Sequence, residues 1–136
     1  MGDPVTIQIA SDEDVVGARR QGAALAAELG FGRGDQTVIA AAISEIARNI
    51  LIYARTGEIE LQSVPDGRCP GLAVVARDEG PGIRDIPQAL QDGYSTSGGL
   101  GLGLPGARRL MDEFDVVSVP GQGTTVTMKK WLRRNG

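Results

Sequence analysis

Hydrophobic and polar residues alternate at the start of the chain and then recur at helical spacing. Residues 5–9, Val-Thr-Ile-Gln-Ile, alternate strictly, which predicts a half-buried strand. Ser11 is followed by three acidic residues, the pattern of an N-cap and the acidic first turn of a helix. We expect this helix to run to about Glu28 or Leu29, with Gly30 as its C-cap.

A second helical pattern covers residues 36–54 and is apolar around most of its circumference. Asp35 is its expected N-cap. A helix of this composition must be buried on most sides, and only a narrow polar stripe interrupts the apolar surface. Glu45 and Asn49 form that stripe, because residues four apart project from one face of a helix, and Arg48 lies beside them.

The rest of the chain predicts mainly strands. The predicted strands cover residues 57–62, 72–77, 114–119 and 124–132, and further helices are predicted over residues 85–93 and 104–113. The strand predicted over residues 72–77, which leads into Asp78, is the most continuously apolar, so we expect it to be central. This order of elements favours an α+β fold. We expect a two-layer α/β sandwich, with a mixed, mostly antiparallel sheet and helices on one face, in a single domain of residues 1–136.

Composition and charge narrow the classes of function. The chain has 136 residues, of which 14 are basic and 17 acidic, so its formal net charge is −3 and it shows no broad footprint for nucleic acid or anionic lipid. It contains no histidine, which excludes histidine-ligated metal sites and Ser-His-Asp chemistry on this chain. Cys69 is alone, and no apolar run approaches membrane-spanning length. We expect a cytoplasmic protein that binds neither nucleic acid nor membrane.

Two polar groups stand where the predicted fold is otherwise apolar. Glu45 and Asn49 offer a carboxylate and an amide oxygen on one helix face, which suits a general base and a hydrated Mg²⁺, or else forms a plain solvated stripe. Asp78 follows the central strand and precedes Gly80 and Gly82. Its carboxylate either caps this turn or accepts a hydrogen bond from an exocyclic amine such as that of adenine.

A run of glycines precedes the helix predicted over residues 104–113. Gly99, Gly101 and Gly103 alternate with leucines. Glycines allow the backbone to approach an anion, and a helix N-terminus supplies free amide donors and the positive end of the helix dipole. The run is therefore either a phosphate-binding loop or a flexible connection. The sequence has no Gly-Lys-Ser or Gly-Lys-Thr, so it is not a P-loop.

Taken together and in this order, these motifs resemble those of the GHKL superfamily of ATPases and kinases. Glu45 and Asn49 are similar to its N box, residues 78–83 to its first glycine box, and residues 99–103 to its second. Residues 121–125 resemble the glycine-threonine turn of the small bacterial members. The resemblance implies the Bergerat fold and a site for ATP or ADP with magnesium.

Within that superfamily the chain resembles the free-standing serine kinases of the anti-sigma regulatory class, and residues 93–106 and 108–114 are similar to the stressosome switch-protein kinases. The resemblance covers essentially the whole chain. It implies a serine/threonine kinase that phosphorylates STAS-domain regulators in a bacterial stress-response partner-switching module. When released, such a kinase binds and activates a PP2C-type phosphatase or another output protein.

The resemblance also implies a role for each matched residue. Glu45 is the expected base that orients or deprotonates the acceptor hydroxyl, Asn49 the expected Mg²⁺ ligand, and Asp78 the group that binds adenine. Residues 94–98 match the lid that closes over the triphosphate. The other expected nucleotide-binding residues are Gly80, Gly82, Ile83, Gly99, Gly101, Leu102, Gly103, Thr124 and Thr125.

Two alternatives remain open at the level of the sequence. The protein could be a non-catalytic, ATP-gated anti-sigma factor or phosphatase activator, although an intact Glu45 favours catalysis because binding alone needs no base. The surface that meets a partner is also undetermined. Arg19 and Arg20 on the first predicted helix either dock an acidic target or form an ordinary solvated face.

Overall fold

Five strands form one sheet in the order β1-β2-β3-β5-β4, and every pairing between them is antiparallel. The computed structural model describes residues 4–64, 70–80 and 103–132. The strands are β1 (Val5–Ile9), β2 (Gly57–Val64), β3 (Gly71–Asp78), β4 (Glu113–Val119) and β5 (Gly123–Trp131). The helices are α1 (Asp12–Glu28), α2 (Arg33–Tyr53) and α4 (Gly103–Leu110). No helix among these residues has the length and apolarity that a membrane crossing requires.

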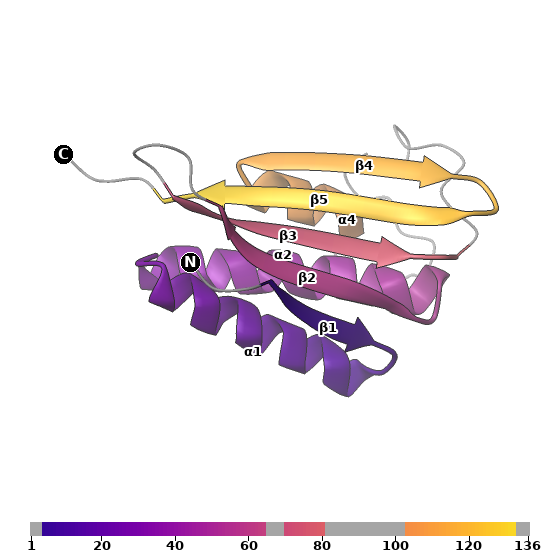
Figure 1. The fold of residues 1–136 in the computed structure, drawn as a ribbon, viewed down its shortest axis with the longest axis horizontal. Coiled ribbons are helices and arrows are strands. Elements are labelled where there is room, and N and C mark those ends of the chain that lie inside the picture. The colour runs from indigo at the N-terminus through magenta and orange to yellow at the C-terminus, as the bar shows by residue number, and fades with distance from the viewer. Residues whose placement is uncertain (1–3, 65–69, 81–102, 133–136) are drawn as a thin grey trace.

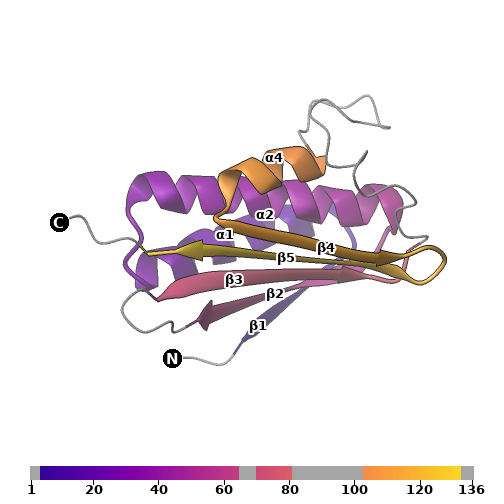
Figure 2. The same cartoon turned by 90° about the horizontal axis from the view of Figure 1, so that it is seen from above.

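The three helices lie together on one face of the sheet. Figure 1 shows α2 and α4 behind the strands and α1 alongside β1, and Figure 2, turned by 90°, shows all three helices on the same side of the sheet. The expected α+β two-layer sandwich with helices on one face is therefore confirmed. The sheet was predicted to be mixed, but all its described strand pairs are antiparallel. The β3 strand is central, as predicted, with β2 on one side and β5 on the other.

Both ends of α1 follow the local sequence. Ser11 forms a capping box: its Oγ accepts from the backbone N–H of Asp14 at 3.4 Å, and the Asp14 carboxylate accepts from the backbone N–H of Ser11 at 3.1 Å. Such a cap contributes about 1 kcal/mol. At the other end Leu29 is the C-cap and Gly30 has a φ of 99°, a left-handed conformation that stops the helix.

The start of α2 differs from the prediction. The helix begins at Arg33, not after Asp35, and its N-cap is Gly32, which makes no side-chain capping bond. The backbone N–H of Gln36 donates to the Gly32 carbonyl at 2.9 Å, which is the first hydrogen bond of the helix. Asp35 lies in the first turn of the helix, where a carboxylate still interacts favourably with the helix dipole.

The end of the last helix also differs. We predicted α4 to reach residue 113, but it ends at Leu110. The following residues are taken up by the sheet, because the backbone N–H of Asp112 donates to the Lys129 carbonyl at 3.0 Å and its carboxylate accepts from the N–H of Trp131 at 2.8 Å. The helix predicted over residues 85–93 lies outside the described residues.

The core forms between the apolar side of α2 and the inner face of the sheet. From α2 it takes Ile39, Ile43, Ile46 and Ile50, and from the strands Ile59, Leu61, Leu72, Val74 and Met128, all at most 2% exposed. Burial of each such side chain contributes about 1.5–3 kcal/mol. This packing fixes the rotation of α2 about its axis and so decides where its few polar side chains point.

The turn between β4 and β5 passes very close to the end of β3. Gly121 and Gly123 in this turn have φ values of 81° and 132°. A Cβ on Gly123 would collide with the backbone carbonyl oxygen of Asp78, whereas a Cβ on Gly121 would meet no atom within 4 Å. The two glycines thus share an unusual backbone conformation but differ in how closely they are packed.

We expect Gly123→Ala to lower the free energy of unfolding by about 2–4 kcal/mol, because it combines backbone strain with a clash that no rotamer can relieve. Gly121→Ala is the matched control and should cost about 1–2 kcal/mol from its left-handed backbone alone. Urea denaturation of both variants measures the difference. Equal losses would contradict the tight contact between the turn and Asp78.

Candidate functional site

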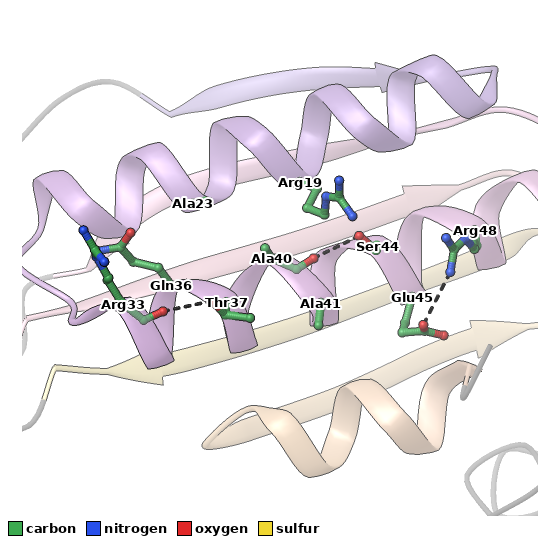
Figure 3. A pocket seen from close by; sticks show the side chains of 10 residues that line it. All are labelled: Arg19, Ala23, Arg33, Gln36, Thr37, Ala40, Ala41, Ser44, Glu45 and Arg48. Atoms are coloured by element: carbon green, nitrogen blue, oxygen red, sulfur yellow. Dashed lines mark hydrogen bonds and ion pairs between the residues drawn. The ribbon is translucent and has the colours of Figure 1, made fainter. Parts of the chain in front are cut away.

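Glu45 and Asn49 lie one turn apart on the half of α2 that leads toward its C-terminus. Both are partly buried, and the Glu45 side chain is 15% exposed. Residues 46, 47 and 50 face the core, so the two polar groups are displaced toward the flank of the helix. Figure 3 shows Glu45 at the edge of α2 that faces α4. The pair is therefore not an ordinary solvated stripe.

Glu45 has a cationic neighbour on its own helix. The guanidinium of Arg48 lies 3.6 Å from the Glu45 carboxylate, and the Arg48 side chain is 55% exposed (Figure 3). An ion pair that is this open to water and salt contributes little, typically below about 1 kcal/mol. Arg48 can therefore leave Glu45 at small cost when another anion is offered to it.

Asp78 ends β3 with its side chain directed toward the helix layer. Side chains alternate along a strand, and Val74 and Ala76, which lie on the same face as Asp78, are buried beneath the helices. The Asp78 carboxylate oxygen Oδ1 accepts from the backbone N–H of Gly80 at 2.9 Å. The turn-capping role is thus present, and it uses only one of about four acceptor positions on a carboxylate.

Three glycines from separate segments surround Asp78. An added Cβ on Gly57 would lie 2.5 Å from the Arg77 carbonyl oxygen and 3.2 Å from the Asp78 Cβ. An added Cβ on Gly80 would lie 2.7 Å from the Cβ of Ala54, just past the end of α2. An added Cβ on Gly123 would collide with the backbone carbonyl oxygen of Asp78. We predicted Gly80 but not the roles of Gly57, Gly123 or Ala54, because each depends on a contact distant in sequence.

Thr124 and Thr125 were both predicted near the nucleotide, and the structure separates them. Thr124 pairs with Asp78 across the β3–β5 ladder, and its hydroxyl lies 2.9 Å from the Ser118 hydroxyl. It shares the inner face with Asp78. Thr125 pairs with Arg77 and points to the opposite face of the sheet, away from the helices. Only Thr124 is therefore brought to Asp78.

Of the glycine run over residues 99–103, only Gly103 lies among the described residues. Gly103 begins α4, and Figure 2 shows that this end of α4 lies at the same end of the molecule as the C-terminus of β3. The N-terminus of α4, with the positive end of its helix dipole, thus lies beside the C-terminal half of α2. The other predicted residues, Gly82, Ile83, Gly99, Gly101 and Leu102, and the lid at residues 94–98, lie outside the described residues.

Glu45, Asn49 and Asp78 form a polar strip along the C-terminal half of α2. The strip runs from Glu45 through Asn49 toward Ala54, over roughly 14 Å of helix rise. At Ala54 the close contact with Gly80 brings in Asp78. One end offers a carboxylate acceptor in a tightly packed turn, and the other offers a carboxylate and an amide near a helix N-terminus. An elongated ligand with a hydrogen-bond donor at one end and an anionic group at the other fits this arrangement.

The side-chain oxygens of Glu45 and Asn49 also suit a magnesium ion that a bound ligand helps to coordinate. In the described stretches of chain, no group of three or more histidine, cysteine, aspartate or glutamate side chains could hold a metal ion. Mg²⁺ typically takes one or two protein oxygens, several waters and the phosphates of a substrate. The Asn49 side-chain oxygen can supply one such ligand, with Glu45 one turn away.

Comparisons with known proteins show the family of this domain. A family model described as a histidine kinase-like ATPase domain matches residues 9–130. The serine/threonine-protein kinase RsbT of Bacillus subtilis (strain 168) is 52% identical over 133 residues, which cover 98% of this chain and 100% of that protein. An anti-sigma F factor of Caldanaerobacter subterraneus subsp. tengcongensis is 33% identical, with 87% of this chain and 85% of that protein covered.

Solved structures share the architecture at low sequence identity. The mycobacterial sensor histidine kinase MprB superposes with a TM-score of 0.56 at 15% identity, covering 99% of this chain and 100% of that one. The catalytic domain of the histidine kinase ThkA gives a TM-score of 0.53 at 14% identity, covering 93% and 95%. At these identities the likeness establishes the fold.

Replacements of Asp78 should separate its structural role from its charge. Asp78→Ala removes the acceptor for the Gly80 N–H and should lower the free energy of unfolding by about 1–2 kcal/mol. Asp78→Asn keeps an oxygen in that position and should stay within about 0.5 kcal/mol of the wild type. Urea denaturation measures both. An equally large loss in the asparagine variant would show that the carboxylate charge itself holds the turn.

Proposed function

This chain belongs to the histidine kinase-like ATPase family, and we propose that it is an ATP- and magnesium-dependent serine/threonine protein kinase. The observation that supports this most directly is the strip on α2, where one fold brings Glu45, Asn49 and Asp78 to a common surface. The match to RsbT over nearly the full length confirms the resemblance drawn from the motifs. It also supports catalysis, because the relative is named as a kinase.

Each residue of the strip has a task that its chemistry allows. Bound ATP supplies the phosphoryl group that is transferred. Glu45 would orient the serine or threonine hydroxyl of the acceptor and take up its proton as the γ-phosphoryl group passes to that oxygen and ADP leaves. Asn49 holds Mg²⁺ through its side-chain oxygen, and Asp78 accepts a hydrogen bond from the exocyclic amine of adenine. The N-terminus of α4, with the positive end of its helix dipole, would favour the phosphates of bound ATP.

The acceptor proteins follow from the same proposal. We propose that the kinase phosphorylates STAS-domain regulators in a cytoplasmic partner-switching module, and that it binds a PP2C-type phosphatase or another output protein when released. The similarity to RsbT and to anti-sigma F factors supports a regulator that exchanges protein partners. The lone cysteine is consistent with a reducing compartment.

A second candidate is a non-catalytic, ATP-gated binding module. The observation in its favour is the match to anti-sigma F factors at 33% identity, since an anti-sigma factor acts by binding. Both candidates need Asp78 and Asn49 to hold a nucleotide. Only the kinase needs Glu45, so this carboxylate distinguishes them.

The first experiment tests the nucleotide site and the transfer together. The protein is incubated with Mg²⁺, γ-labelled ATP and a single-domain STAS protein from the same genome, and label is expected on a serine or threonine of that protein. Asp78→Asn should weaken ADP binding by about 10-fold or more in calorimetry, because an amide donor replaces the acceptor that faces the adenine amine. Undiminished ADP affinity in this variant would exclude Asp78 from the adenine site.

The second experiment tests the base. Glu45→Gln should retain ADP affinity within about twofold but slow labelling of the STAS protein by about 100-fold or more. Glu60→Gln is the matched control, because Glu60 forms a similar 3.6 Å ion pair with Arg77 on the opposite face of the sheet. Full binding with no transfer by the wild-type protein would favour the binding module.

A further inference from the structure

A groove runs between α1 and α2 on the outer side of the helix layer, away from the sheet. Figure 3 shows Arg19 reaching from α1 over this groove and Arg33 and Arg48 marking its two ends along α2. Its volume is about 640 Å³, and Glu45 contributes to its rim. The groove therefore adjoins Glu45, the proposed base. It lies on the outer side of α2, whereas the polar strip follows the flank of α2 next to α4.

The charge of the groove is opposite to that of the chain. Three arginines and a single glutamate line it, although the chain as a whole has a formal net charge of −3. The uncharged polar side chains that line the groove already donate hydrogen bonds to backbone carbonyls. Gln36 donates to the Phe31 carbonyl at 2.8 Å, Thr37 to the Arg33 carbonyl at 3.0 Å and Ser44 to the Ala40 carbonyl at 3.0 Å. The guanidinium groups are thus the main polar groups offered outward.

Alanines line the middle of the groove, and exposed aliphatic side chains lie near it. Ala23, Ala40 and Ala41 line its middle, so no large side chain fills it. On the same outer surface, Val16 precedes Arg19 by three residues and Ile52 follows Arg48 by four, and they are 42% and 51% exposed. Arginine with exposed aliphatic groups is typical of a protein interface, whereas a small anion would need no such apolar surface.

The length of the groove also indicates a macromolecular ligand. Arg33 and Glu45 are twelve residues apart on one helix, a separation of about 18 Å. An element of a folded protein can span that distance, with carboxylates near Arg19 and Arg33 and its far end at Glu45. A single phosphate or carboxylate ion cannot contact both ends.

We propose that this groove docks an acidic surface of the phosphoacceptor protein and so delivers its hydroxyl to Glu45. The inference rests on the proposed kinase function and adds the surface and the charge of the partner. Arg19 and Arg33 pair with carboxylates of the acceptor. Arg48, which is weakly held by Glu45, turns toward the same acidic surface as the acceptor arrives.

The position of Arg33 makes the proposal testable through kinetics. A residue about 18 Å along the helix from the base cannot touch the reacting atoms, so it acts through binding alone. Its replacement should raise the KM for the acceptor and leave kcat unchanged, whereas loss of a catalytic group would lower kcat. Cross-interface charges of this kind act mainly on the association rate and are sensitive to salt.

The experiment compares Arg19→Glu and Arg33→Glu, singly and together, with Arg20→Glu in the labelling assay. Arg20 is the matched control, because it is exposed beside Arg19 on α1, changes the net charge equally and does not line the groove. We expect the KM for the STAS protein to rise about 10-fold or more in the double variant and to stay within about twofold for Arg20→Glu. ADP affinity should be unchanged in all of them, and the wild-type KM should rise with NaCl.

Three outcomes would overturn the docking proposal. The first is a KM for Arg33→Glu equal to that of the wild type. The second is an equal rise in KM for Arg20→Glu, which would indicate nonspecific electrostatics. The third is a changed oligomeric state of Arg33→Glu in gel filtration, which would assign the groove to contacts between copies of this chain.

A failure of the kinase function is distinguishable from a failure of docking. If wild-type protein transfers no label even at saturating acceptor, the proposed activity is wrong, and calorimetric binding of the same STAS protein then decides the docking question. Weaker binding by Arg33→Glu but not by Arg20→Glu would support the groove without the chemistry. Equal binding by all variants would exclude it.

Discussion

The site depends on a close approach of three backbone segments at the end of β3. Gly57, Gly80 and Gly123 come from the start of β2, the loop after β3 and the start of β5, and a side chain at any of them would collide with its neighbours. Because proteins are packed to near-crystalline density, such contacts leave little freedom to the residue between them. Asp78 is that residue. Its carboxylate is therefore held by the backbone around it, and Gly80 ties it to the end of α2.

The second constraint is the double use of α2. Its apolar side packs on the sheet, and this packing fixes the rotation of the helix about its axis. The direction in which each polar side chain of α2 leaves the helix is therefore fixed as well. Glu45 and Asn49 fall on the flank next to α4, and Arg33, Ala41 and Arg48 fall on the outer surface next to α1. A single rigid helix can thus support chemistry on one flank and recognition on its outer side, with Glu45 where they meet.

Much of the fold could be predicted from local patterns. Ser11 with Asp14 gives a capping box that needs no other part of the chain, and the alternation of apolar residues located β1 and β2 almost to the residue. Predictions failed where a distant segment decides the outcome. Asp35 looked like a cap, but Gly32 already starts the helix through its backbone. The helix predicted to reach residue 113 stops at Leu110 because Asp112 is bound to β5.

The same distinction applies to the site and explains what a motif can and cannot specify. Glu45, Asn49 and Asp78 are visible in sequence because their chemistry stands out against apolar neighbours. The choice between Thr124 and Thr125 depends on the β3–β5 register, which puts Thr124 opposite Asp78 and turns its neighbour away. The groove has no sequence motif at all. It exists because α1 and α2 pack side by side, and arginines from both helices then converge on a surface that neither helix forms alone.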